Sequence, residues 1–105
     1  MNNIKTFENF NNQDIFKYIR NNDIQSVKNY IDSGYDLNIN EDEYDCTPLI
    51  YATKYKRIEI IKLLLNAGAD PNKQNIHGDT ALIFSVSSNY DEIIELLLKI
   101  NNNLT

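Results

Sequence analysis

Residues 47–72 read TPLIYATKYKRIEIIKLLLNAGADPN, and this stretch decides the fold because the chain repeats it 33 residues later. Laid over residues 80–105, it is identical at nine of 26 positions, including the leading threonine and three consecutive leucines. A weaker copy covers residues 14–38 at an offset of 34, which predicts one inserted residue within 39–46. Self-similarity at this period indicates stacked units, three of which are enough to bury a shared core.

Within each unit the pattern predicts a helix, a tight turn, a second helix and a loop that begins at a glycine. In the middle unit Thr47 suits the N-cap, and Pro48 suits the first helical position, where a missing N–H costs nothing. The second helix carries an apolar stripe at the spacing of an amphipathic helix, made of Ile58, Ile61, Leu64 and Leu65. Gly68 stands where a left-handed residue ends the helix.

The third unit repeats this arrangement with Thr80 as its first N-cap. Its second helix has the matching stripe of Ile94, Leu97 and Leu98. Asn101 takes the position of the glycine, and asparagine enters the left-handed region more readily than most residues. We therefore expect this helix to end at Asn101.

The first unit has the same helix pair, with Asp23 placed to cap the second helix and Gly34 to end it. Asn22 and Asn89 fall at the turn between the helices of their units, where a left-handed residue is often required. Lys56 takes that position in the middle unit and suits it less well.

The chain has fifteen acidic and ten basic side chains, a net charge of −5. No strongly basic face is expected, which disfavours nucleic-acid binding because such binding depends on cationic contacts with phosphates. The apolar runs are too short to cross a bilayer, and the first residues lack the pattern of a secretory signal. The single cysteine, Cys46, cannot form an internal disulfide. We expect a cytoplasmic protein that binds neither nucleic acid nor membrane.

The runs TPLIYA at 47–52, IIKLLL at 60–65 and AGADPN at 67–72 closely resemble the ankyrin repeat. Isoleucines at 50 and 83 stand where the family usually has histidine, and Asp45 replaces the loop glycine that Gly78 keeps. The resemblance covers residues 14–105. It implies an all-α ankyrin-repeat solenoid of three stacked helix-turn-helix units with finger-like hairpin loops.

The resemblance places the repeats at about 14–46, 47–79 and 80–105, and the fingers at about 37–46 and 71–79. Residues 1–13 are then an N-terminal extension. Ile4, Phe7 and Phe10, spaced three apart, form either a helical turn that covers the first unit or part of a frayed tail.

Ankyrin repeats usually contact a partner through their concave face, built from the fingertips and the exposed side of each first helix. Carried over by position, that surface comprises Arg20, Asn21, Asn40, Glu43, Tyr44, Cys46, Lys54, Tyr55, Gln74, Ile76, His77, Asp79, Ser87 and Ser88. Tyr44, Tyr55 and Ile76 are the candidate anchors, because exposed aromatic and apolar side chains tend to dominate binding energy. Tyr55 has an alternative role, packing between neighbouring helices.

Two charged stretches have competing interpretations. The acidic finger 41–45 (EDEYD) either engages a basic groove on a partner or is a solvated loop that maintains solubility. Lys54, Lys56 and Arg57 close the first helix of the middle unit, where interaction with the helix dipole accounts for them.

The sequence shows little chemistry. His77 is the only histidine and lies on a loop, and no nucleophile and base can be assembled around it. Cys46 and His77 lie on adjacent fingers, but two ligands do not make a zinc site. Asn72 lies in a loop resembling those that asparaginyl hydroxylases modify, although this asparagine is normally structural. We predict no enzyme activity, no metal and no cofactor.

The function that fits best is a non-catalytic protein–protein interaction module, or scaffold, whose partner the sequence does not identify. One alternative is a small acidic inhibitor or antitoxin-like protein that occludes a partner enzyme. Another is a structural fragment that either completes a longer stack or self-associates through its C-terminal end. That alternative rests on residues 91–100, whose apolar stripe has no polar capping unit after it. We expect a monomer, or weak self-association through the C-terminal repeat.

Overall fold

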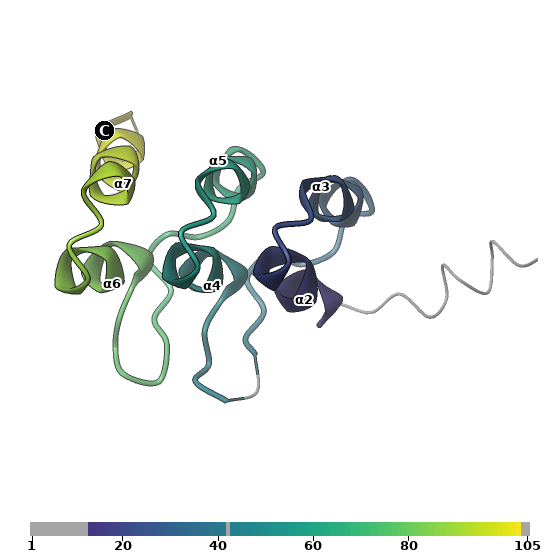
Figure 1. Ribbon diagram of the computed structural model, residues 1–105, viewed down its shortest axis with the longest axis horizontal. Coiled ribbons are helices and arrows are strands. Elements are labelled where there is room, and N and C mark those ends of the chain that lie inside the picture. The colour runs from purple at the N-terminus through teal and green to yellow at the C-terminus, as the bar shows by residue number, and fades with distance from the viewer. Residues whose placement is uncertain (1–12, 42, 104–105) are drawn as a thin grey trace, which may run out of the picture.

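The computed structural model describes residues 13–41 and 43–103. This part of the chain contains no strand, and its helices are α2 (Asp14–Arg20), α3 (Ile24–Asp32), α4 (Pro48–Lys54), α5 (Ile58–Asn66), α6 (Ala81–Ser87) and α7 (Asp91–Asn103). Figure 1 shows two layers, α2, α4 and α6 in one and α3, α5 and α7 in the other, with two hairpin loops projecting from the first layer. The predicted all-α solenoid of stacked helix-turn-helix units is confirmed.

The predicted helix starts are confirmed at three N-caps. The Thr47 hydroxyl accepts a hydrogen bond from the Ile50 N–H at 3.3 Å, and Thr80 accepts in the same way one repeat later at 3.2 Å. Asp23 accepts from both the backbone N–H and the hydroxyl of Ser26, at 3.2 and 2.7 Å. Such caps satisfy N–H groups that the first helical turn leaves without partners.

The turn inside each helix pair has the left-handed residue that the sequence predicts. φ is 54° at Asn22, 58° at Lys56 and 59° at Asn89. In every pair the next N–H then bonds back to the carbonyl five residues earlier, at 2.8 to 2.9 Å, which closes the first helix of the pair. Lys56 adopts the left-handed conformation although lysine is less suited to it, because the repeat geometry requires it there.

The apolar stripes differ in detail from the sequence prediction. In α5, Ile60, Ile61 and Leu64 are fully buried, whereas Ile58 and Leu65 are only half-buried. These three residues form the buried face of α5. That face is wider than the predicted stripe because α5 packs on both α4 and α3.

The third pair departs further from the prediction. Over residues 91–100 of α7 the buried residues are Ile93 and Leu97; Ile94 is half-buried and Leu98 is 45% exposed. Leu98 is exposed because no described residue packs beyond the third pair. The prediction that Asn101 ends the helix is wrong, since α7 continues through Asn103. Asparagine tolerates the left-handed conformation without requiring it.

Two remaining expectations concern the N-terminal residues and the crossing of a membrane. Ile4, Phe7 and Phe10 lie outside the described residues, so the proposed N-terminal turn stays a prediction. No helix in the described ranges has the length and apolar character needed to cross a membrane.

Candidate functional site

Two hairpin fingers, 37–46 and 71–79, project from the first layer of helices (Figure 1). Each is closed at its base by a backbone hydrogen bond, from Glu41 N–H to the Cys46 carbonyl and from Asn75 N–H to the Asp79 carbonyl, both 2.9 Å. Side-chain amides brace the same loops internally. Asn40 Nδ2 donates to the Asp45 carbonyl at 2.8 Å. The fingers are therefore ordered by their own polar groups.

The two fingers are also joined to each other. The Ile76 N–H donates to the Tyr44 carbonyl at 2.9 Å, which fixes the tips of adjacent fingers side by side. Nearer the helices, the Asp70 N–H donates to Asn38 Oδ1 at 2.8 Å. Asn72 is exposed and its N–H bonds to Asp70 Oδ1 at 2.9 Å, so its backbone is part of the loop structure.

The inner side of the fingers forms a small hollow between aromatic and charged groups. It has a volume of about 220 Å³ and is lined by Tyr44, Cys46, Lys54, Asn75, His77, Asp79 and Phe84. The Tyr44 and His77 rings lie 6.0 Å apart. Lys54 Nζ lies 5.4 Å from the Tyr44 ring centroid and 5.9 Å from that of Tyr55. This geometry allows cation–π attraction, which holds the ammonium group near the hollow.

A second aromatic group connects this hollow to the first repeat. The Tyr51 and Tyr55 rings lie 5.0 Å apart, and Phe16 meets Tyr51 edge-on at 5.1 Å. Arg20 Nη1 donates to the Tyr51 hydroxyl at 3.0 Å. Burial raises the pKa of Tyr51 above its ordinary value, because the charged phenolate loses its hydration there. Of the two roles that the sequence left open for Tyr55, packing is observed, since its ring lies against Tyr51. Its side chain is half-buried, and its contact with a partner stays a prediction.

The residues predicted to contact a partner have different environments. Nine of them are exposed: Arg20, Asn21, Glu43, Tyr44, Lys54, Gln74, Ile76, His77 and Ser87. Asn40, Tyr55, Asp79 and Ser88 are half-buried. The prediction that Cys46 lies on the contact surface is wrong, because its side chain is only 4% exposed and its sulfur accepts a hydrogen bond from Asn75 Nδ2 at 3.8 Å. Cys46 is therefore a core residue. Burial also raises the pKa of its thiol, and a thiol that stays protonated is a weak nucleophile.

Sequence reasoning missed Tyr51, Asn75 and Phe84. Tyr51 and Phe84 are one repeat apart, and this recurring aromatic on the first helix was an available signal. Asn75 gave no such signal. Its Oδ1 accepts from the N–H groups of His77 and Asp79, at 2.9 and 3.0 Å, so it sets the shape of the second finger.

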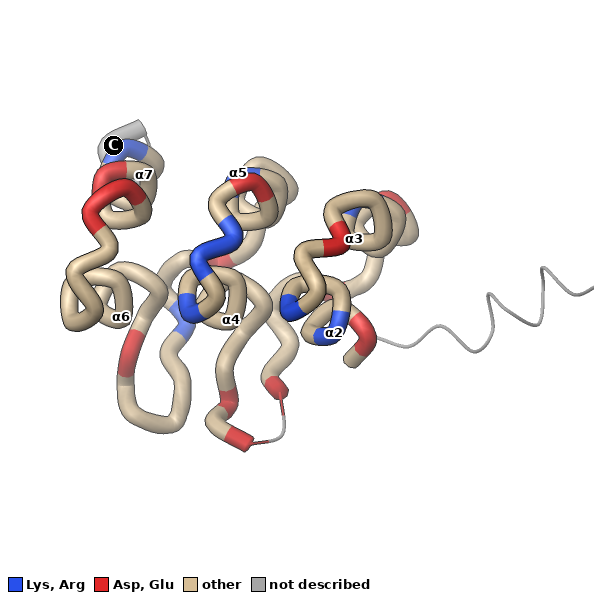
Figure 2. The backbone as a smooth tube through the Cα atoms, viewed as in Figure 1, with Lys and Arg blue, Asp and Glu red and all other residues tan. Residues whose placement is uncertain are grey.

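Charge is divided between the fingers and the helix turns. Figure 2 shows acidic residues on both fingers and a run of basic residues where α4 leads into α5.

The predicted interaction of Arg57 with the dipole of α4 needs correction, because Arg57 lies in the turn after α4 and not at the end of that helix. Its Nε donates to the Ile19 carbonyl at 3.0 Å and its Nη2 to the Arg20 carbonyl, so it caps α2 of the neighbouring repeat. These bonds link two repeats.

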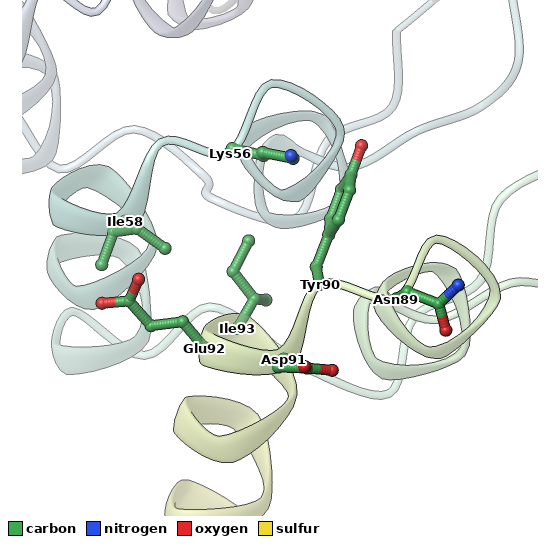
Figure 3. A pocket seen from close by; sticks show the side chains of 7 residues that line it. All are labelled: Lys56, Ile58, Asn89, Tyr90, Asp91, Glu92 and Ile93. Atoms are coloured by element: carbon green, nitrogen blue, oxygen red, sulfur yellow. The ribbon is translucent and has the colours of Figure 1, made fainter.

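A groove of about 370 Å³ lies between the second and third repeats on the turn side. Figure 3 shows Lys56 beside the Tyr90 ring, and its Nζ is 4.4 Å from the ring centroid. Ile58, Glu92 and Ile93 also line this groove. Within the described residues, no group of three or more His, Cys, Asp or Glu side chains is placed to hold a metal ion.

Comparison with known proteins places this geometry in a family. The family model for ankyrin repeats (3 copies) matches residues 11–105. The chain is 40% identical over 93 residues to an ankyrin repeat protein of fowlpox virus (strain NVSL), an alignment that covers 87% of this chain and 12% of that protein. It is 39% identical over 72 residues to an ankyrin repeat protein of Acanthamoeba polyphaga mimivirus, covering 69% of this chain and 9% of that protein. It thus spans about a tenth of the length of these relatives.

A solved structure shares the fold. It is the complex of a predatory endopeptidase from Bdellovibrio bacteriovorus with an immunity protein, in which the matched chain is 29% identical with a TM-score of 0.75. The match covers 87% of this chain and 47% of that one. Because the family model matches all but the first ten residues, the chain belongs to the ankyrin repeat family.

Proposed function

We propose that this chain is a non-catalytic protein-binding module whose partner lies on the concave face. Ankyrin repeats are generally protein–protein interaction modules. The observation that carries the assignment to this face is the fingertip patch, defined as Tyr44, Ile76 and His77. Ile76 is 63% exposed and Tyr44 41% exposed, although both are large and apolar.

The fingertip patch is preorganised. The Ile76 N–H to Tyr44 carbonyl bond holds the two tips together, and the Tyr44 and His77 rings are adjacent. Association costs conformational entropy for every side chain and loop that must be ordered, so a patch already fixed by backbone bonds loses less on binding. Aromatic and apolar groups in such positions are the usual hot spots of an interface.

Acidic side chains surround the fingertip patch. Glu43 and Asp45 are exposed on the first finger, and Asp79 is half-buried on the second. A partner with a basic surface fits this arrangement, because opposite potentials speed encounter and exclude like-charged proteins. Raising the salt concentration should therefore slow association more than it changes dissociation.

The test is partner capture with matched variants. We expect Tyr44→Ala and Ile76→Ala each to weaken binding about tenfold to a hundredfold, the range for truncating an interface anchor. Val86→Ala is the control, since Val86 is also apolar and exposed but lies on α6 away from the fingers. Partner recovery that depends on Val86 and ignores both fingertip substitutions would refute binding through the fingertip patch.

A second candidate function is occlusion of a partner enzyme, in line with the solved complex of an endopeptidase and an immunity protein. In this case the acidic fingers lie over the partner's active site. A captured partner with enzyme activity should lose it when the chain is added, and Ile76→Ala should restore it. Full activity of the partner at saturating chain would exclude occlusion and leave the binding module intact.

A further inference from the structure

Three basic side chains gather around one tyrosine ring, beside the hollow between the fingers. Lys54 Nζ and Arg57 Cζ each lie 5.9 Å from the Tyr55 ring centroid. Arg20 reaches the same group from the first repeat, because its Nη1 donates to the Tyr51 hydroxyl and the Tyr51 and Tyr55 rings lie 5.0 Å apart. We call Arg20, Lys54 and Arg57 the cation cluster. It joins the end of α2, the end of α4 and the turn that follows α4.

The cation cluster carries charge that the described residues do not neutralise. Within residues 13–41 and 43–103, none of its three members forms an ion pair with a carboxylate. Glu41 on the first finger attracts Arg20 electrostatically but does not pair with it. The helix dipole favours a single cation at the end of α2 and of α4, and attraction to an aromatic ring draws cations together, but neither supplies a counter-ion. In a chain of net charge −5, the cluster is a local reversal of sign.

The three cations are also held in place by contacts within the chain. Arg57 donates to two carbonyls at the end of α2, and Arg20 donates to the Tyr51 hydroxyl. Lys54 lies within cation–π range of two tyrosine rings. Side chains that are already ordered lose less entropy when a ligand binds them. The guanidinium N–H groups that these contacts leave over can donate to a carboxylate.

We propose that the cation cluster binds the carboxylate side chains of an extended acidic segment in the partner protein. This inference rests on the proposed binding at the concave face and specifies part of what the partner supplies there. Figure 2 shows basic residues on α2 and where α4 leads into α5, and acidic residues on the fingers next to them. Opposite charges on neighbouring parts of one face fix the orientation of a partner, because the reversed orientation brings like charges together. Nucleic acid fits less well, since the acidic fingers and the net charge of −5 repel a continuous phosphate backbone.

The test is binding of a labelled synthetic peptide in which glutamate alternates with serine, measured by fluorescence anisotropy at low salt. Alternate side chains of an extended peptide point the same way, roughly 7 Å apart, so several carboxylates can reach the cluster at once. We expect a dissociation constant below about 1 mM, and no binding of the same peptide with glutamine in place of glutamate. Lys54→Gln and Arg20→Gln should each weaken binding about twofold to fivefold, and together about tenfold. Lys62→Gln is the matched control, because it removes the same charge from an exposed lysine on α5.

Two results would overturn the proposal. One is the absence of peptide binding at about 1 mM chain, or equal affinity of the parent and the Lys54→Gln, Arg20→Gln double variant. The other is tighter binding of a single-stranded RNA of similar length that depends on the same two residues, which would make the cluster a phosphate site. Failure of the fingertip patch is distinguishable, because the peptide has no large apolar side chain to occupy it. Peptide binding that is lost in the double variant and unchanged in Ile76→Ala supports the cation cluster even where partner capture ignores the fingertips.

Discussion

Position 45 allows a direct test of the cost of a left-handed residue in this repeat. Asp45 has φ of 58°, and Gly78, one repeat later, has φ of 80°. A Cβ built on Gly78 meets nothing within 4 Å, so a side chain there causes backbone strain without a clash. Exchanging these two residues therefore changes conformational energy and little else. We expect Asp45→Gly to stabilise the protein and Gly78→Asp to destabilise it.

The magnitude follows from two opposing contributions. A left-handed conformation costs an ordinary L-residue about 1–2 kcal/mol, with aspartate near the lower end. Glycine loses about 0.5–1 kcal/mol more backbone entropy on folding than a residue with a Cβ. The difference is about 0.5 kcal/mol in favour of glycine at position 45, and at least as much lost by Gly78→Asp. A change of 1 kcal/mol moves the melting temperature by roughly 4 °C in a domain of this size.

Urea unfolding followed by circular dichroism measures both variants. Asp45→Asn is the control, because it removes the charge from the acidic finger while keeping a side chain that tolerates the left-handed region. Asp45→Gly should exceed Asp45→Asn in free energy of unfolding, and Gly78→Asp should fall below the parent. A stabilising Gly78→Asp, or equal effects of the two substitutions at position 45, would refute the strain argument.

Three further outcomes follow from the packing. Leu64→Ala should cost about 2–5 kcal/mol of unfolding free energy, since Leu64 is fully buried, while Leu98→Ala should cost about 1 kcal/mol or less because Leu98 is 45% exposed. Urea titration compares the two variants, and similar losses would contradict the argument from burial. Burial raises the pKa of Tyr30 to about 12, so between pH 10 and 12 the unfolded chain releases a proton that the folded chain keeps. Stability should fall by about 2–3 kcal/mol over that interval, and Tyr30→Phe should flatten the decline measured by urea unfolding at each pH. Arg57→Met should cost about 1–2 kcal/mol by removing the bonds to the last carbonyls of α2; an unchanged denaturation midpoint would show that the link between repeats contributes nothing.

Much of the fold could be predicted because its signals are local. A threonine N-cap, as at Thr47 and Thr80, depends only on neighbouring residues, because the hydroxyl accepts a hydrogen bond from the N–H three residues later. The same holds for the left-handed turns at Asn22 and Asn89, whereas Lys56 adopts that conformation because the repeat geometry requires it. Repetition at 33 residues adds the one long-range fact, that equivalent positions face equivalent neighbours.

The candidate site was less predictable because it depends on contacts between fingers. Cys46 was expected at the surface, but the Asn75 amide meets its sulfur and both are buried. The bond from Ile76 to Tyr44 joins residues 32 positions apart through backbone atoms, which leave no trace in side-chain identity. Arg57 likewise serves a helix of the preceding repeat.

The sequence by itself determined the repeat, its caps and its turns, because these are properties of a few consecutive residues copied at a fixed period. The tertiary structure alone decided which copies of an apolar residue are covered. Val86 and Thr53 occupy the same position in their helices, yet the more apolar of the two is the one exposed. Burial depends on the neighbour that packs against a residue, and among the described residues the third helix pair has a neighbour on one side only.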